Sequence, residues 1–140
     1  MAAALASALL LVFPHGTVTI AKAGGGVAKV RVEIAETAAQ QERGLMYRRR
    51  LAARSGMVFV FASDTRGAFW MKNTLIPLSI AFYDGDGKIL RIMVMKPCKV
   101  ARCPSYDPKV AFRGALEVNR GAFRRWGVHR GDVVTLTRDP

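Results

Sequence analysis

The chain has 140 residues, of which 51% are hydrophobic, and it carries a net charge of +12 at pH 7 with a pI of about 10.7. This length supports one domain with one core, and this composition excludes a disordered chain. The charge favours anionic partners, but the basic residues are spread along the chain and interleave with no aromatic tract. We therefore expect a generally basic surface and no nucleic-acid site.

The first segment, Ala2–Phe13, is apolar apart from Ser7 and is too short to span a bilayer as a helix. It is followed by Ala21-Lys22-Ala23, which has the A-x-A form of a cleavage site. We expect residues 1–23 to be a signal peptide and residues 24–140 to be a single exported domain, periplasmic or secreted, without a stable membrane span. The segment lacks an early Lys or Arg, so a tail on a cytosolic protein is the alternative.

The next two segments predict a strand and then a helix. Val27–Ile34 alternates apolar and polar residues, which is typical of a half-buried strand. Thr37 and Gln40 have the spacing of a capping box, so a helix is expected from there to about Arg49. Gly44 inside this helix indicates close backbone packing or an earlier helix end.

The middle of the chain predicts four strands. Gly56–Phe61 is a continuous apolar run that is typical of a doubly buried strand, and Phe69–Met71 is a short second strand. Leu78–Tyr83 and Lys88–Met95 are joined by Asp84–Gly87, a strong hairpin signal. A calcium loop is not expected there, because oxygen ligands are missing where such a loop requires them.

Two cysteines lie in a proline-containing loop, Lys96–Val110. Cys98 and Cys103 are separated by four residues, which differs from the Cys-x-x-Cys of redox enzymes. We expect a disulfide, since an oxidising compartment permits one. Free thiols and metal or redox chemistry are the alternatives, although His129 is the single histidine left after the expected cleavage and structural zinc needs four ligands.

The last third predicts a strand at Phe112–Val118 and a short helix, Arg120–Trp126, with Asn119 as its cap and Gly127 at its end. A final strand is expected at Val133–Thr137. Six or so short strands and two short helices, without regular strand–helix–strand alternation, predict a mainly β single domain. An antiparallel β-sandwich or barrel-like architecture is the expected form.

One short stretch combines residue types that a core strand does not need. Trp70, Lys72 and Asn73 place an aromatic ring, an ammonium group and an amide close together. This combination is common where proteins bind sugars or anions, because the ring stacks and the polar groups donate hydrogen bonds. The structural alternative is that Trp70 is core, Lys72 extends its stem along apolar surface, and Asn73 holds a turn.

Charged residues elsewhere are further candidates for the same ligand site. Glu42 and Arg43 lie on the first predicted helix, while Glu117 and Asn119 share one face of a predicted strand. Glu117 with Glu42 or Asp64 is a candidate carboxylate pair of the kind hydrolases use. A nucleophile elbow and glycine-rich phosphate loops are absent from the sequence, so no cofactor is expected.

Four separated segments carry a family resemblance, and they are Glu42-Arg43-Gly44-Leu45-Met46, Gly56–Phe61, Phe69–Ile80 and Leu116–Asn119. In this order they resemble the DUF192 family, small bacterial and archaeal proteins of unknown function, over roughly Val30 to Leu136. The resemblance implies a mainly β, sandwich-like fold and names no reaction. The family often carries Asp after Ile-Pro-Leu, where this chain has Ser79.

Three functions follow as expectations. The first is an exported protein that binds a small polar or anionic ligand, such as an envelope saccharide, near Trp70, Lys72 and Asn73. The second is a hydrolase or lyase on envelope polymers, with Glu42 or Glu117 as general acid or base and Lys72 stabilising negative charge. The third is a structural or interaction protein whose motifs hold the fold. An open cleft with converging polar groups would favour the first two.

Overall fold

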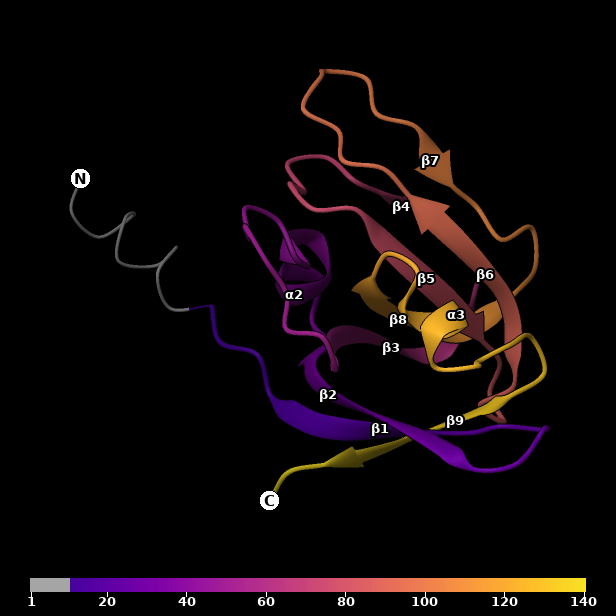
Figure 1. Ribbon diagram of the computed structural model, residues 1–140. Coiled ribbons are helices and arrows are strands. Elements are labelled where there is room, and N and C mark those ends of the chain that lie inside the picture. The colour runs from indigo at the N-terminus through magenta and orange to yellow at the C-terminus, as the bar shows by residue number, and fades with distance from the viewer. Residues whose placement is uncertain (1–10) are drawn as a thin grey trace.

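The computed structural model describes residues 11–140, and most of the apolar segment at the start of the predicted signal peptide lies outside this range. The described chain forms nine strands and two short helices (Figure 1). The helices are α2 (Ala38–Arg43) and α3 (Ala122–Arg125). The strands are β1 (His15–Ala21), β2 (Val27–Ala35), β3 (Ser55–Thr65), β4 (Phe69–Trp70), β5 (Leu78–Tyr83), β6 (Ile89–Met95), β7 (Ser105–Tyr106), β8 (Phe112–Asn119) and β9 (Val133–Arg138).

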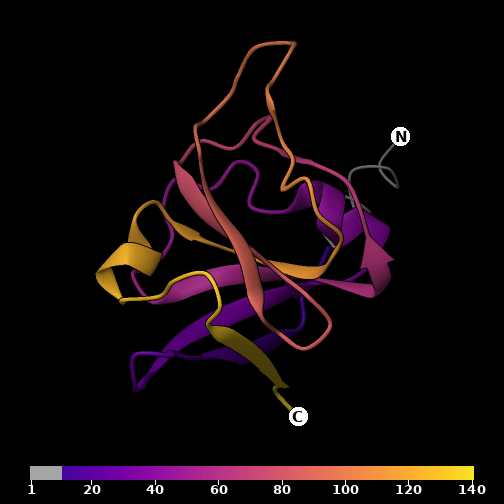
Figure 2. The same ribbon diagram turned by 90° about the vertical axis from the view of Figure 1, so that its right-hand side faces the viewer.

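Seven strands form one curved sheet in the order β6-β5-β8-β3-β2-β1-β9, and β4 pairs with β7 in a small second sheet. The pair β2–β3 is parallel because the chain crosses over through α2, and the other pairs are antiparallel. The sheet curls until β9 meets the β5–β6 hairpin at a single bridge, Lys88–Val133 (Figure 2). The predicted mainly β fold with two short helices is confirmed, as a mixed sheet that does not close into a barrel.

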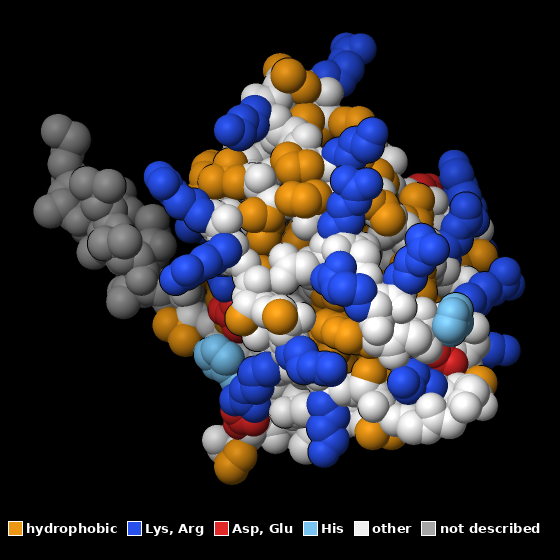
Figure 3. Space-filling model, viewed as in Figure 1, with side chains coloured by type: hydrophobic (Ala, Val, Ile, Leu, Met, Phe, Trp, Pro, Cys, Tyr) orange, Lys and Arg blue, Asp and Glu red, His pale blue; other side chains and the backbone are white. Residues whose placement is uncertain are grey.

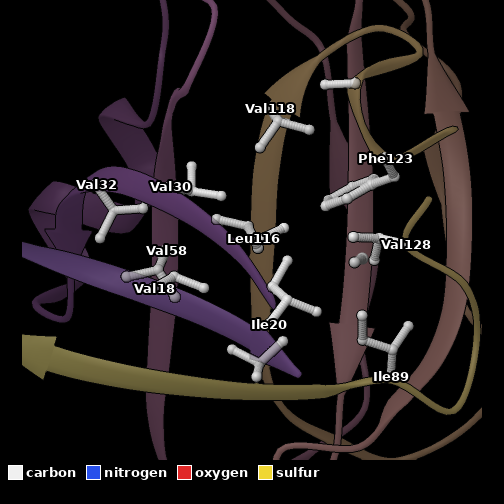
Figure 4. Packing of buried hydrophobic residues seen from close by; sticks show 14 of the residues in the cluster. Val18, Ile20, Val30, Val32, Val58, Ile89, Leu116, Val118, Phe123 and Val128 are labelled. Atoms are coloured by element: carbon white, nitrogen blue, oxygen red, sulfur yellow. The ribbon is translucent and has the colours of Figure 1, made fainter. Parts of the chain in front are cut away.

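The first of two cores lies inside the curl of the sheet. Alternate residues of β2 point into it, and α3 and the turn after it supply Phe123 and Val128 (Figure 4). Val30 and Leu116 are completely buried there. This period-two pattern is the one that Val27–Ile34 indicated, since successive strand residues face opposite sides of a sheet.

The second core lies on the opposite face of β3, β5 and β8 and is aromatic. The rings of Phe59 and Phe69 meet edge to face with centroids 4.9 Å apart, and Phe82 and Phe112 repeat this arrangement at the same distance. Such contacts add about 1 kcal/mol each to the burial of the rings. Leu45 from the turn after α2 belongs to this core, and Phe69 from β4 packs against it, so both segments lie beside this face of the sheet.

A strand that the sequence analysis did not predict is β1. It pairs with β2 on one side and β9 on the other, and its Val18 and Ile20 are fully buried. The amide of Ala23 donates a 2.9 Å hydrogen bond to Oδ1 of Asp132. The end of the segment assigned to a signal peptide is thus part of the sheet, and cleavage after Ala23 would remove β1.

Both helices differ in extent from their predictions. Helix α2 ends at Arg43 instead of about Arg49, because Gly44 takes a φ of 48°, a conformation that glycine adopts without steric cost. Helix α3 follows Gly121, so the prediction that Asn119 caps it was wrong. In both cases a glycine with positive φ sets the boundary.

The predicted disulfide is confirmed between Cys98 and Cys103, whose Cα atoms are 5.9 Å apart. It closes the tip of the long loop between β6 and β7. The backbone of this loop reaches the segment after β4, where the amide of Asn73 donates to the carbonyl of Cys98 at 3.0 Å. The loop therefore supports the residues next to Trp70.

Candidate functional site

A cleft runs between α2 with the turn after it and the face of the sheet that carries the second core. Its inner part, the deep hollow, is a cavity of about 220 Å³ that reaches Glu117. A wider part of about 500 Å³, the outer hollow, lies beside it and is lined by Lys72 and Asn73. The two parts form one cleft because both are lined by Glu42, Arg43, Met46 and Trp70.

Local hydrogen bonds fix α2 at the rim of this cleft. Thr37 and Gln40 form the predicted capping box, with Gln40 N donating to Thr37 Oγ1 at 3.2 Å and Thr37 N donating to Gln40 Oε1 at 3.0 Å. Nε2 of Gln41 donates to the carbonyl oxygens of Ala35 and Val60 at 3.3 and 3.0 Å. These bonds tie the helix to β2 and β3, so that Glu42 and Arg43 stand at the cleft.

Glu117 lies in the middle of the sheet, on β8. Its neighbours across the two adjacent strands are Met57 and Ile80, both completely buried, and Glu117 itself is 5% exposed. Within residues 11–140 its carboxyl group has no hydrogen bond and no ion pair. Burial in this apolar setting raises the pKa of Glu117 to about 8, so the group is mainly protonated at pH 7.

The segment after β4 forms the opposite rim. Trp70 is 51% exposed, and Nζ of Lys72 lies 5.8 Å from the centre of its ring. Asn73 holds a φ of 57°, and its carbonyl accepts a 2.8 Å hydrogen bond from the amide of Tyr47. Asn73 thus joins the turn after α2 to the disulfide loop, and it lines the outer hollow as well.

The cleft offers three kinds of interaction. Its walls are rings that can stack on a flat apolar surface, its rim carries the charged Glu42 and Arg43, and its floor presents a carboxyl group that can donate or accept a hydrogen bond. The aromatic wall consists of Phe59, Phe61, Phe69 and Trp70. In the described part of the chain no group of three or more His, Cys, Asp or Glu side chains is arranged to hold a metal ion.

A family model, DUF192, described as an uncharacterized ACR, matches residues 19–136. The chain belongs to the DUF192 family. Two solved structures share the fold and about a third of the residues, and no curated protein matches the chain.

The first of these structures is from Sinorhizobium meliloti 1021 and is described as a "putative transcription regulator". It is 33% identical, has a TM-score of 0.83, and is matched over 90% of this chain and 96% of that one. The second is a protein of unknown function from Novosphingobium aromaticivorans, with 32% identity and a TM-score of 0.78. It is matched over 85% of this chain and 83% of that one.

In this DUF192 protein the four segments that carry the family resemblance meet at the cleft. They do so although Glu42 and Glu117 are 75 positions apart in the chain. Each segment supplies at least one residue to the deep hollow, including Phe59 from β3 and Trp70 from β4. Six of the seven predicted ligand-site residues line one or both hollows, and they are Glu42, Arg43, Trp70, Lys72, Asn73 and Glu117.

The seventh residue, Asn119, lies elsewhere. Its Nδ2 donates to the carbonyl oxygens of Leu51 and Ala52 at 2.7 and 3.4 Å, so it holds the loop before β3. Asp64, weighed as a partner for Glu117, instead pairs with Arg113 at 3.0 Å at an exposed position. These two polar side chains therefore have partners of their own elsewhere in the fold and do not line the cleft.

Ser79, where the family often carries Asp, also lies outside the cleft. Its Oγ accepts a 3.0 Å hydrogen bond from the amide of Gly121, just before α3. The residue is 2% exposed and faces the first core's side of β5. An aspartate could accept the same hydrogen bond, so this departure concerns the start of α3 and leaves the cleft intact.

Sequence reasoning found Trp70 but missed the three phenylalanines of the aromatic wall and the polar residues Gln41 and Thr74, which also line the deep hollow. The alternation in Val58-Phe59-Val60-Phe61 places both rings on one face, which was a usable signal. It was not recognised because a continuous apolar run also fits a strand buried on both faces.

Proposed function

We propose that this DUF192 protein binds a small polar ligand in the cleft, with Glu117 at the floor and Trp70 at the wall. The observation that carries the proposal is the carboxyl group of Glu117, which is 5% exposed, borders the deep hollow and has no partner within residues 11–140. Among the described residues no side-chain oxygen or nitrogen that is closed to solvent lacks a hydrogen-bond partner, so the carboxyl oxygens of Glu117 reach the cavity, where water or a ligand can bond to them. A ligand that hydrogen-bonds this group would complete the site.

The residues around Glu117 support this function. The exposed ring of Trp70 can stack on the apolar face of a sugar, while Arg43 and Lys72 can donate to hydroxyl or anionic groups. The hollows of about 220 and 500 Å³ suit a ligand of one or two rings. An envelope saccharide has this size and this mixture of surfaces.

The test is a thermal-shift screen of the disulfide-bonded protein against mono- and disaccharides, amino acids and organic acids. We expect at least one class to raise Tm in the wild type and in the control variant Glu36→Gln, whose carboxylate lies outside the cleft and pairs with Arg138. Trp70→Ala and Glu117→Gln should each weaken that ligand about tenfold or more. Equal ligand affinity in all four proteins, or no ligand at all, would contradict the proposal.

A second function, hydrolysis or elimination on an envelope polymer, is favoured by one observation. Glu42 and Glu117 line the same hollow, and Glu117 is protonated at neutral pH, as a general acid must be. Glu42 would then act as the base and Lys72 would stabilise negative charge. Release of reducing ends from envelope polysaccharide, lost by at least about 100-fold in Glu117→Gln, would support it, and binding without turnover would exclude it.

We further propose that the protein is exported. A disulfide such as Cys98–Cys103 persists in oxidising compartments, which supports export. The described residues 11–140 contain no helix that is long and apolar enough to cross a membrane. Iodoacetamide added to unreduced, fractionated cells should leave both cysteines of the periplasmic or secreted protein unlabelled. Labelling of both, in a cytosolic fraction, would contradict export.

Nucleic acid is not part of the proposal, in spite of the description of the Sinorhizobium protein. Lys and Arg side chains are scattered over the face seen in Figure 3 instead of forming one stripe. We expect a labelled DNA duplex to show no saturable binding at about 150 mM salt, where nonspecific phosphate contacts are screened. Tight, sequence-dependent binding would refute this expectation.

A further inference from the structure

The two hollows of the cleft differ in charge. The deep hollow contains both carboxyl groups, Glu42 and Glu117, within a largely aromatic wall. The outer hollow adds Lys72 and Asn73, and its acidic residue is the shared Glu42. Arg43 borders both hollows, with its guanidinium carbon 5.2 Å from the centre of the Tyr47 ring.

We propose that the ligand is a small zwitterion, with a cationic group held by Glu117 in the deep hollow and an anionic group held by Lys72 and Arg43 at the outer hollow. A phosphorylated amino sugar has this chemistry. The inference rests on the proposed function, because it assigns a ligand class to the same cleft.

A cation suits the deep hollow for two physical reasons. An ionised carboxylate surrounded by Met57 and Ile80 is unfavourable alone, and an entering ammonium group supplies the charge that the protein does not. The faces of aromatic rings also attract cations, and Phe69 and Trp70 border this hollow. An anion there would meet the two acidic side chains Glu42 and Glu117 and only one cation, Arg43.

An anion suits the outer hollow because its cations are free to bind one. Within residues 11–140 neither Lys72 nor Arg43 forms an ion pair, and each lies over a ring, Trp70 and Tyr47 respectively. Both groups are therefore held near the mouth of the cleft, and neither is paired with Glu42, the carboxylate that lines the same hollow. A phosphate or carboxylate placed there would form charge-assisted hydrogen bonds.

Binding of a cation at Glu117 must displace a proton. The pKa of the free group is about 8, so a bound ammonium that ionises it should cause net proton release at pH 7. At pH 9 the group is already mostly ionised, and an amine that was neutral in solution takes up a proton when it binds. The other charged side chains bordering this hollow are Glu42 and Arg43, both from α2. A neutral hydroxyl bound to the protonated acid would release no proton.

The test compares four probes that differ in charge at two positions, namely glucose, glucosamine, glucose 6-phosphate and glucosamine 6-phosphate. Calorimetry on the full chain, in two buffers of different ionisation enthalpy, gives affinity and proton release together. We expect glucosamine 6-phosphate to bind about 10-fold to 100-fold tighter than either singly charged probe, with glucose weakest.

Two variants separate the two ends of the ligand. Glu117→Gln should abolish the preference for the amino sugars and keep the preference for phosphate, while Lys72→Ala should do the reverse. Glu36→Gln and Lys99→Ala are charge-matched controls outside the cleft and should behave as the wild type. Circular dichroism checks the fold of each variant, and proton release by the wild type tests the cation site without any substitution.

Each result decides a different claim. If probes with and without the amino group bind equally well, or if binding releases no proton at pH 7, the cation site is wrong while ligand binding in the cleft stands. If binding ignores the phosphate, the anion site is wrong. If none of the four binds at millimolar concentration, both this inference and the proposed saccharide-like ligand are refuted.

Discussion

Two buried carboxyl groups, one in the turn before β9 and one in the centre of the sheet, have opposite surroundings. Asp132, 3% exposed in the turn before β9, accepts hydrogen bonds from the amides of Ala23 and His129 at 2.9 and 2.7 Å. Glu117, 5% exposed at the floor of the cleft, has no such bond within residues 11–140. Burial alone would raise both pKa values, but these donors lower that of Asp132, whereas that of Glu117 rises to about 8.

The difference separates a structural acid from a candidate ligand-binding one. Asp132 fastens the turn before β9 to the segment after β1, so its charge is satisfied within the fold. The chain supplies no equivalent for Glu117, although it places that group between two apolar neighbours in the central strands. A buried carboxyl group at a cavity without a protein partner is the feature on which the proposed ligand site rests.

The largest effect is expected from removing residues 1–23. This truncation deletes β1, with the fully buried Val18 and Ile20, and takes away the Ala23 amide that Asp132 binds. Cooperative unfolding in urea should disappear, because β9 loses the strand it pairs with and β2 loses one of its two neighbours. Removal of residues 1–10 is the control and should leave the transition unchanged. A cooperative transition in the shorter chain would show that the Asp132 end of the sheet is dispensable.

The second effect is on the pH dependence of stability at Glu117. Its pKa is raised in the folded state, so the free energy of unfolding should fall as pH rises from about 4.5 to about 8 and then level off. The variant Glu117→Gln has no carboxyl group to ionise at this position, so its free energy of unfolding should not show this fall. The variant should match the wild type near pH 4.5 and exceed it by as much as about 5 kcal/mol at pH 9. Urea denaturation across this range measures the difference, and parallel curves would contradict an unpaired buried acid.

The third prediction concerns Asp132, whose replacement should lower the free energy of unfolding, whereas replacement of Glu117 should raise it at high pH. Asp132→Asn replaces an acceptor of two N–H donors by an amide that can serve one of them, and should cost about 3 kcal/mol at pH 7. Because the pKa of Asp132 is lowered, its contribution is present above about 3.8 and is lost as pH falls below it. The variant and the wild type should therefore converge at low pH. A constant difference down to pH 2 would mean that the charge plays no part.

The smallest effect is expected at the disulfide loop. Cys98→Ser with Cys103→Ser should reduce the free energy of unfolding by about 2 kcal/mol, because the closed loop is short. Amide NMR shifts should change around Lys72 and Asn73, whose segment is bonded to Cys98, and stay fixed around Asp132. Shifts spread evenly over both regions would show that the two ends are coupled.

Local signals predicted much of this fold. The alternation in Val27–Ile34, the capping box at Thr37 and the hairpin at Asp84–Gly87 each act within a few residues, so a sequence pattern is enough to find them. Strand β1 was missed because an apolar stretch followed by A-x-A fits a cleaved signal as well as an inner strand. Its pairing with β9 joins residues more than 110 positions apart.

The candidate site was predictable as a set of residue types and not as a geometry. Trp70, Lys72 and Asn73 are close in sequence and were identified together. Glu117 was identified as a strand carboxylate that could pair with Glu42 or Asp64. That Glu117 and Glu42 border one hollow depends on the crossover through α2 and the pairing of β3 with β8. Asn119 was wrongly predicted at the site for the same reason, because its partners Leu51 and Ala52 lie in a loop that is distant in the sequence.

The most direct test of the account is a ¹³C NMR titration of the Glu117 side-chain carboxyl in the free protein, assigned by comparison with Glu117→Gln. We predict a midpoint of about 8, set by burial without a partner, and a fall in that midpoint when glucosamine 6-phosphate is added. A midpoint near 4.5 in the free protein would mean that the group is solvated or already paired. That result would contradict a site prepared for a ligand.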